Sequence, residues 1–291
     1  MVGAGGLEPP APASQTRCAT GLRYAPSEMS IMRSRQDRQV IAMFPALYHS
    51  HHIRNSEDQS FWLDLAKHHG ARILELGCGT GRVLLPLAEA GYRTYGLDRD
   101  AQMLSFLKDI TPVGLRSQVN IFQGDLCAYH LAAQFSLILL PCNTYSTLSP
   151  IQRAQALRRV RQHLQPSGIF AASMPNPALL EILLLRSDPE IEEVFPHPQD
   201  GEPVQVSSAW KRTRHQVAIT WYYDHLLPDG KVHRTTQRVT HYITPIDTIT
   251  GEFYAAGLEI TGLYGNFDNS PYTLEANYLI LLAQPGTASH F

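Results

Sequence analysis

The sequence predicts an α/β fold, with a doubly wound, mainly parallel sheet that carries an inserted antiparallel β-meander. Between residues 71 and 175, short apolar strand patterns alternate with helix patterns, and such repeated units build a parallel sheet with helices on both faces. The pattern changes after Pro177, where β-rich segments occupy about 190–243 and include a Pro-Asp-Gly turn. The last helix and two strands can return to the main sheet.

The elements follow in order from their local signals. A first helix is expected to begin at Ser56, whose neighbours 57–59 complete a capping box, and to end at Gly70. Further helices are expected at 81–91, 100–110, 151–164 and 247–257, with a bend at Pro86 because proline lacks a backbone donor. Strands are expected at 71–76, 92–98, 119–125, 135–141, 168–175, 203–212, 215–227, 232–244, 258–265 and 277–284.

Composition excludes several classes of protein. The chain has 291 residues and is 44% apolar, which suits a globular α/β domain, and its 24 Lys and Arg against 26 Asp and Glu give a net charge of −2. Such a balance offers no basic field for nucleic acid. The four cysteines form no CxxC pair, and the longest apolar run, residues 179–185, is far shorter than a membrane helix. We therefore expect a cytoplasmic protein that binds neither nucleic acid nor a membrane.

The first part of the chain lacks any helical or strand period. Residues 1–42 mix Gly, Pro, Ser and Arg and are expected to form a disordered leader ahead of a domain at 43–291. The stretch "GGLEPP…GLRYAP" resembles the product of a transfer-RNA gene translated on the opposite strand. One hypothesis is therefore that the true start is Met29, Met32 or Met43, and the alternative is a genuine disordered leader.

The stretch "ILELGCGTGR", residues 73–82, places three glycines at alternate positions directly behind an apolar strand. A dinucleotide-binding turn would need a glycine at position 82, which is Arg82. Alternate glycines let the backbone pass close to a ligand whose polar tail lies against main-chain N–H groups. With Glu75 ahead of them, the glycines favour an amino-acid tail over a pyrophosphate.

At this motif the chain resembles the class I S-adenosylmethionine-dependent methyltransferases, specifically their small-molecule branch, over residues 48–284. The resemblance implies a seven-stranded Rossmann-like sheet, S-adenosyl-L-methionine as cofactor and a small-molecule methyl acceptor. It assigns the methionine part of the cofactor to Glu75, Gly77, Gly79 and Gly81. The same resemblance assigns the ribose hydroxyls to Asp98 and the adenine to Asp125 and Leu126, and "HLQPSGIF" matches the family's turn into the fifth strand, with Ser167 in place of one glycine.

Candidates for the methyl-acceptor site lie outside the carboxyl ends of the parallel strands. They are Tyr48 and Asn143 as catalytic residues, and Tyr145, Asp268 and Tyr272 as substrate residues. The alternative for Tyr48 is a lid aromatic over the cofactor, for Asn143 a turn residue, and for Asp268 an Asx turn before Ser270 and Pro271. We expect the reaction to methylate O or N of a small metabolite.

Two further features have competing interpretations. The run "HSHH" at 49–52 has no carboxylate at ligand spacing, so solvated lid histidines are favoured over a metal site and no metal is expected. Pro141 and Cys142 stand where 5-methylcytosine methyltransferases carry a Pro-Cys nucleophile, which would make nucleic acid the substrate. The net charge opposes that reading, and a buried thiol is the commoner role.

The meander carries four aromatic residues whose role the sequence leaves open. Trp210, Trp221, Tyr222 and Tyr223 are expected to shape the acceptor pocket or a homodimer contact, since alternate strand positions face opposite ways. A third class of function is a non-catalytic S-adenosylmethionine-binding protein, because a fold does not guarantee turnover.

Overall fold

The computed structural model describes residues 35–54 and 56–286 and contains two sheets. The larger has seven strands in the order β10-β11-β5-β4-β1-β2-β3. β1 to β5 run parallel, while β11 pairs antiparallel with both β5 and β10. Its strands are β1 (Arg72–Leu76), β2 (Arg93–Asp98), β3 (Val119–Gln123), β4 (Phe135–Leu140), β5 (Leu164–Pro175), β10 (Leu258–Tyr264) and β11 (Tyr278–Pro285). The predicted doubly wound, seven-stranded, mainly parallel sheet is confirmed.

Helices cover both faces of this sheet, because successive residues of a buried strand point to opposite sides. On β4, Leu137 and Leu139 join a core with α3 and α4, whereas Ile138 and Leu140 join a second core with α6 and α8. The helices and 3₁₀ turns of this part are α3 (Gln59–His69), α4 (Leu84–Glu89), α5 (Ala101–Ile110), η1 (Val113–Leu115), η2 (Thr144–Thr147), α6 (Pro150–His163), α7 (Pro177–Ile182) and α8 (Ile246–Ala255).

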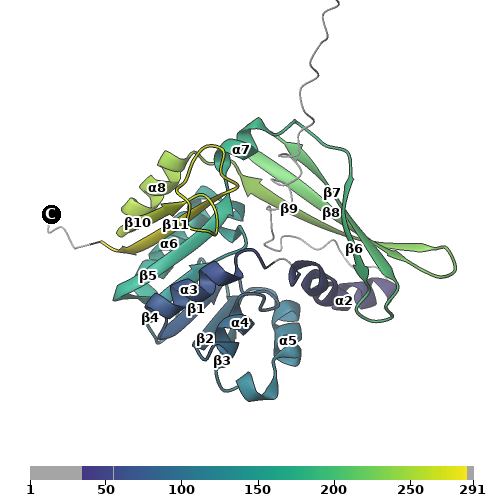
Figure 1. Ribbon diagram of the computed structural model, residues 1–291, viewed down its shortest axis with the longest axis horizontal. Coiled ribbons are helices and arrows are strands. Elements are labelled where there is room, and N and C mark those ends of the chain that lie inside the picture. The colour runs from purple at the N-terminus through teal and green to yellow at the C-terminus, as the bar shows by residue number, and fades with distance from the viewer. Residues whose placement is uncertain (1–34, 55, 287–291) are drawn as a thin grey trace, which may run out of the picture.

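The insertion forms a separate antiparallel sheet of four strands. They are β6 (Glu190–Pro196), β7 (Pro203–Arg212), β8 (Gln216–Leu226) and β9 (Val232–Tyr242). Figure 1 shows this sheet beside the large one, with the helix α2 (Arg35–His52) lying against it. Alternate residues of β8, from Val217 to Tyr223, are buried in a core with Phe44 and Leu47 of α2. The predicted β-rich insertion is therefore present, with β6 as a strand that the sequence pattern did not predict.

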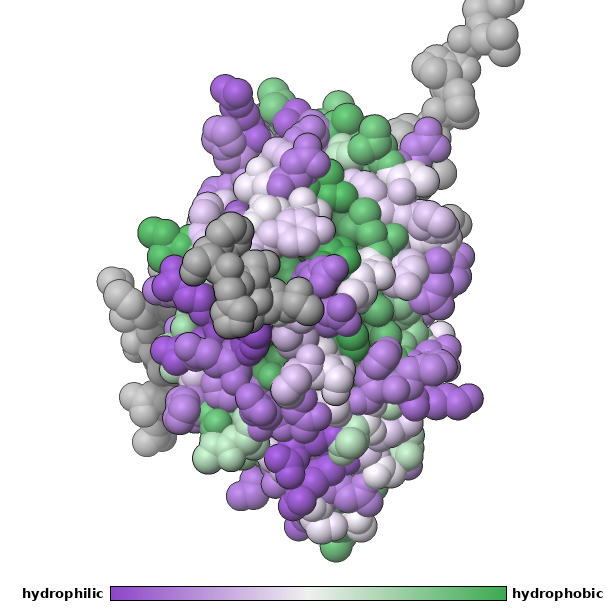
Figure 2. Space-filling model, turned by 90° about the vertical axis from the view of Figure 1, so that its left-hand side faces the viewer, coloured by the Kyte–Doolittle hydropathy of each residue, from purple (hydrophilic) through white to green (hydrophobic). Residues whose placement is uncertain are grey.

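Figure 2 shows the side of the molecule where β10 forms the edge of the large sheet and α8 lies close by, at the left of Figure 1. Hydrophilic residues cover most of this face, with hydrophobic ones gathered between them. Among the described helices, none is both long and apolar enough to cross a membrane.

Three local expectations differ from the structure. Helix α3 begins at Gln59, so its N-cap position is Asp58 and not Ser56; the Asp58 carboxylate accepts from Trp62 and Arg82 and makes no capping hydrogen bond. The second expected helix, 81–91, is shorter in the structure: α4 begins at Leu84, so Pro86 lies in its first turn, where backbone N–H groups have no partner within the helix. α2 begins at Arg35, within the stretch 1–42 that was expected to be unstructured; the rest of that stretch, with Met29 and Met32, lies outside the described residues.

Candidate active site

A cavity of about 380 Å³ opens at the carboxyl ends of β1, β2 and β4. This is the edge at which open α/β sheets bind their ligands. The glycine turn after β1 forms its floor, the ends of β2 and β3 one wall, and η2 another. α2 and two strands of the insertion complete it. The sequence-predicted cofactor residues that line this cavity are Glu75, Gly77, Gly79, Asp98, Asp125 and Leu126.

The glycine turn has a backbone that other residues rarely adopt. Gly77, Gly79 and Gly81 have φ values of 71°, 51° and 85°, all in the left-handed region. The backbone N–H groups of Gly77 and Cys78 donate to the Leu97 carbonyl oxygen at 2.7 and 3.1 Å, which fixes the turn against β2. A Cβ on Gly81 would lie 2.4 Å from Leu107 Cδ1. Gly81 therefore serves close packing beneath the turn, and Gly77 and Gly79 face the cavity.

Asp98 connects the glycine turn to the start of α5. Its Oδ2 accepts a hydrogen bond from Gly79 N at 2.8 Å, and its Oδ1 accepts one from Asp100 N at 2.9 Å. Burial raises the pKa of the Asp98 carboxyl, against the effect of these two backbone donors. Because each carboxylate oxygen can accept two hydrogen bonds, both retain capacity toward the cavity.

Glu75 is a buried carboxyl group with unused hydrogen-bonding capacity. It is 2% exposed and lines the cavity, and its Oε2 accepts no hydrogen bond from any described residue. Burial raises the pKa of Glu75 well above its ordinary value, although Arg82 opposes this. A buried acceptor without a partner is costly, so the site is suited to a ligand that brings a donor or a positive charge.

Arg82 forms a buried ion pair that the sequence did not reveal. Its two terminal nitrogens donate to the two carboxylate oxygens of Asp58 at 2.6 Å each, and Nη2 also donates to Cys142 Sγ at 2.9 Å. Asp58 in turn accepts from Trp62 Nε1 at 2.9 Å. Arg82 thus links α3, the glycine turn and the end of β4 at the cavity wall. The one signal in the sequence for this ion pair was Arg82 itself, which stands where a dinucleotide-binding motif has its third glycine.

Asp125 and Leu126 follow β3 and line the far wall of the cavity. Asp125 Oδ1 accepts a hydrogen bond from Cys127 N at 2.8 Å, which orders the turn. Leu126 supplies an apolar surface there, and Leu148 faces the same cavity from the segment after η2.

The insertion contributes three polar side chains to the cavity, from Gln216, Thr240 and Tyr242. Gln216 pairs with Tyr242, and Ala218 with Thr240, so these side chains lie on one face of β8 and β9. Tyr48 reaches the cavity from α2, and its ring lies 4.0 Å from the position of a Cβ on Gly79. Of the predicted acceptor residues, only Tyr48 lies in the cavity.

The other four predicted acceptor residues do not line the cavity. Asn143 is buried in a left-handed conformation with φ 63°, between the lining residues Cys142 and Thr144. Asp268 is exposed and accepts from Ser270 N at 2.9 Å, the Asx turn considered as its alternative. Tyr272 donates to Asn176 Oδ1 at 2.7 Å. Asp268 and Tyr272 belong to the β10–β11 loop, and β10 lies four strands, or about 19 Å, from β1.

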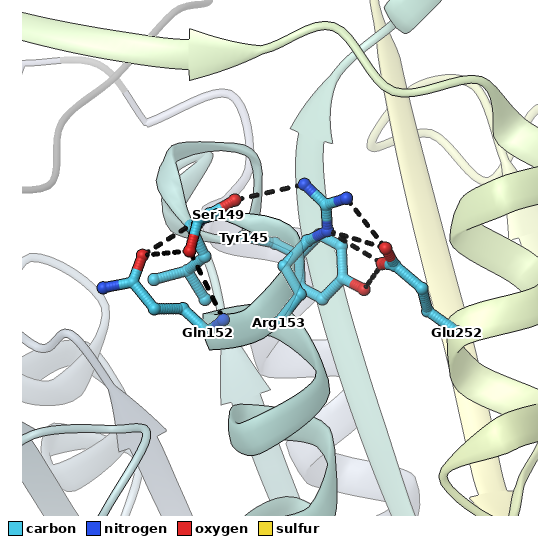
Figure 3. Close-up of polar contacts among 6 residues, drawn as sticks. Tyr145, Ser149, Gln152, Arg153 and Glu252 are labelled. Carbon is cyan, nitrogen blue, oxygen red and sulfur yellow. Dashed lines mark hydrogen bonds and ion pairs between the residues drawn. The ribbon is translucent and has the colours of Figure 1, made fainter.

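Tyr145 belongs to a network behind the cavity wall (Figure 3). Its hydroxyl donates to Glu252 Oε2 at 2.6 Å, and Arg153 binds the same carboxylate through Nε and Nη2. Burial, reinforced by Glu252, raises the pKa of Tyr145 far above its ordinary range. The Tyr145 side chain therefore ties η2 to α8 and does not line the cavity, where a substrate contact was expected.

The histidine run of α2 is packed in the protein interior and not solvated as expected. His49 Nδ1 lies 3.1 Å from Thr80 Oγ1, beside the glycine turn. His51 and His52 are buried, and His51 Nδ1 lies 3.0 Å from the Tyr223 hydroxyl. His51 packs against Tyr223 of β8 and Phe195 of β6, so its burial follows from the contact between α2 and the small sheet.

The aromatic residues of the meander are likewise structural. Trp210, Trp221 and Tyr223 are buried in the core of the small sheet, and Tyr222, on the opposite face, lies under the Arg234 guanidinium at 4.9 Å. None of these four lines the cavity. The described cysteines, Cys78, Cys127 and Cys142, are free thiols. Burial raises the pKa of Cys142 despite the opposing charge of Arg82, which disfavours a nucleophilic thiolate.

Comparison with known proteins gives a consistent result. Residues 73–168 match the family described as a methyltransferase domain. The chain is 25% identical over 217 residues to the cypemycin N-terminal methyltransferase of Streptomyces sp, covering 74% of this chain and 83% of that protein. It is 35% identical over 111 residues to the magnesium-protoporphyrin O-methyltransferase of Rhodobacter capsulatus, covering 38% and 48%.

A solved structure shares the fold. The S-adenosylmethionine-dependent methyltransferase from Clostridium acetobutylicum ATCC 824 superposes with a TM-score of 0.68 at 17% identity, covering 83% of this chain and 98% of that one. The sheet order, the left-handed glycine turn and these similarities define the class of enzyme. The chain is a class I S-adenosylmethionine-dependent methyltransferase.

Proposed function

We propose that this enzyme methylates N or O of a small, polar molecule held between the glycine turn and the insertion. The observation that carries the proposal is the composition of the cavity at the carboxyl ends of β1, β2 and β4. It combines Glu75, with an unused acceptor, and Asp98 on one side with three uncharged polar side chains of the insertion on the other.

The cofactor fits the hydrogen-bond acceptors that line this cavity. Glu75 Oε2 supplies a buried acceptor for the ammonium group of S-adenosylmethionine, and its negative charge suits a cationic ligand. Asp98 retains acceptor capacity for two ribose hydroxyls, and Asp125 with Leu126 frames the adenine. Cβ-free glycines at 77 and 79 let the methionine tail approach the backbone.

The acceptor would then lie toward α2 and the insertion. Gln216, Thr240 and Tyr242 offer amide and hydroxyl groups, which recognise hydroxyl or amine groups by hydrogen bonds. These three side chains carry no charge, so a hydroxylated or amino-substituted molecule is favoured over a polyanion. Tyr48 stands between this surface and the glycine turn, where it can orient the acceptor.

The bound sulfonium supplies an already electrophilic methyl group. The residues of this chain therefore mainly have to orient the acceptor lone pair and exclude water. Tyr48 and residues of the insertion line the same cavity as the glycine turn, where they can shield the reacting atoms from water. The alternative with Cys142 as a nucleophile requires a thiolate, and burial of Cys142 works against it.

Calorimetric titration of the full chain is the direct test. We expect binding of S-adenosylmethionine and of its demethylated product, and no binding of NADH. Turnover is then screened on amino sugars, peptide amines and hydroxylated aromatics, because binding without turnover on any acceptor would support the non-catalytic alternative. Binding of NADH alone would contradict the cofactor assignment.

Variants separate the two halves of the cavity. Gln216→Ala and Tyr242→Phe should raise the KM for the acceptor while leaving cofactor affinity unchanged. Thr220→Ala is the matched control, because Thr220 lies on the same face of β8 but does not line the cavity. Unchanged acceptor kinetics in both variants would place the acceptor elsewhere.

Cys142→Ser tests the nucleic-acid alternative. Turnover of a small acceptor should remain within a few-fold of wild type, because serine can still accept the hydrogen bond from Arg82. Complete loss of activity, together with a covalent adduct formed by the wild type with cytosine analogues, would instead support nucleic acid as the substrate.

A further inference from the structure

A group of metal-ligating side chains lies on the insertion, away from the methylation cavity. It consists of His197 and Asp200 in the turn between β6 and β7, and His225 near the end of β8. Gln216, which lines the cavity, begins β8 nine residues earlier, or about 30 Å along the strand. This group therefore has no part in the cofactor site.

The ligand atoms of the three side chains lie close together. His197 Nδ1 lies 3.1 Å and His225 Nε2 3.2 Å from the same oxygen, Asp200 Oδ1, and the three ligand atoms all lie within 4.8 Å of one another. Two ligand atoms of a tetrahedral zinc ion lie roughly 3.3–3.4 Å apart, given metal–ligand bonds of about 2.0–2.1 Å. The spacing of the two imidazole–carboxylate pairs is thus already close to that of a metal site.

We propose that His197, Asp200 and His225 form a binding site for a divalent transition-metal ion, with zinc as the expected metal. Two imidazole nitrogens and one carboxylate oxygen are a ligand set that suits zinc. The Asp200 side chain is 42% exposed, which leaves room for water as a fourth ligand. His233, paired with His225 across β8 and β9, is a second source of that ligand.

The two imidazole rings of the site lie against each other. The His197 and His225 rings stack with centroids 3.8 Å apart and planes at 6°. Metal binding requires the rings to splay so that both nitrogens point to one ion.

Such an ion would fix the β6–β7 turn to the end of β8. His197 is buried and Asp200 accepts from the Glu202 backbone N–H at 3.1 Å, so two of the ligands stand on an ordered turn. Three ligands from two segments of the chain would be held by one ion, and its loss would loosen this end of the sheet without reaching the cavity.

Titration of the tag-free, chelator-treated full chain with Zn²⁺ tests the proposal. We expect one high-affinity equivalent per chain, and a Zn²⁺ affinity lower by about tenfold or more in Asp200→Asn and in His225→Ala. His215→Ala is the matched control, since His215 is exposed at the opposite end of the same sheet and should bind zinc like the wild type. Circular dichroism establishes that each variant is folded, and Asp200→Asn, at an exposed position, keeps the test independent of folding.

Two further measurements complete the experiment. Zn²⁺ should raise the Tm of the wild type by about 2 °C or more and raise that of Asp200→Asn by clearly less. Co²⁺ bound in place of zinc should give ligand-field absorption that both ligand variants lose. No zinc uptake by the wild type, or equal uptake by the wild type, Asp200→Asn and His225→Ala, would overturn the proposal.

Discussion

His241 is a fully buried histidine whose protonation should destabilise the fold. Its Nδ1 lies 2.9 Å from Ser146 Oγ, and Ser146 Oγ donates to the Asn143 carbonyl oxygen at 2.8 Å. Since that hydroxyl hydrogen is used, Nδ1 must carry the ring hydrogen and donate to Ser146. Nε2 is buried with no hydrogen-bond partner among the described residues. Desolvation by burial lowers the pKa of His241 to about 3.

The magnitude follows from proton linkage. Between a folded pKa of about 3 and an ordinary value of 6.5, the unfolded chain binds more protons at this site than the folded one. The stabilising contribution of neutral His241 is therefore fully present above the unfolded pKa of 6.5. It is lost as the pH falls from there toward the folded pKa of about 3. Between about pH 8 and about pH 5 the loss is about 2 kcal/mol, set almost entirely by the unfolded pKa.

Urea unfolding at these two pH values measures the effect against a variant. His241→Asn keeps a donor toward Ser146 but does not titrate, so its free energy of unfolding should fall by about 2 kcal/mol less on acidification than that of the wild type. Subtracting the two differences removes every other titrating group. Equal acid-induced losses in both proteins would refute a neutral, buried His241.

Three other predictions concern the cofactor site and the network behind it. Asp98→Ala should weaken S-adenosylmethionine binding by about 1.5–3 kcal/mol through lost charge-assisted hydrogen bonds, measured by calorimetry; affinity within about twofold of wild type would remove Asp98 from the ribose role. Because burial raises the pKa of Glu75, cofactor binding should favour its ionised form and release protons, so affinity should increase with pH in the wild type and not in Glu75→Gln. Glu252→Ala should cost about 3–5 kcal/mol in the free energy of unfolding, since it leaves Arg153 buried without its carboxylate; a loss below about 1 kcal/mol would contradict that role.

The four predicted acceptor residues that do not line the cavity share one feature. Asn143, Tyr145, Asp268 and Tyr272 all follow strands, and the sequence alone does not say to which side a side chain turns after its strand ends. Tyr145 turns to Glu252, about a hundred residues away along the chain. Asp268 and Tyr272 follow the carboxyl end of β10, on the same side of the sheet as the carboxyl ends of the parallel strands. However, β10 is the outermost strand, four strands away from β1 and the glycine turn.

The metal-ligand group on the insertion was invisible for a similar reason. His197 and Asp200 are three residues apart, but His225 comes from another strand, and only the pairing of β7 with β8 brings it to them. No local spacing pattern in the sequence therefore indicates that these three residues lie together.

The sequence by itself determined the alternating strands and helices, the β-rich insertion and the glycine turn. Each depends on local properties, namely the period of apolar residues and backbone conformations at Gly77, Gly79 and Gly81 that favour glycine. Tertiary structure alone decided which distant side chains share the cavity. Gln216 and Tyr242 face the same cavity as Gly77 because the insertion packs against α2 and η2, and such long-range packing follows from the summed burial of many apolar side chains.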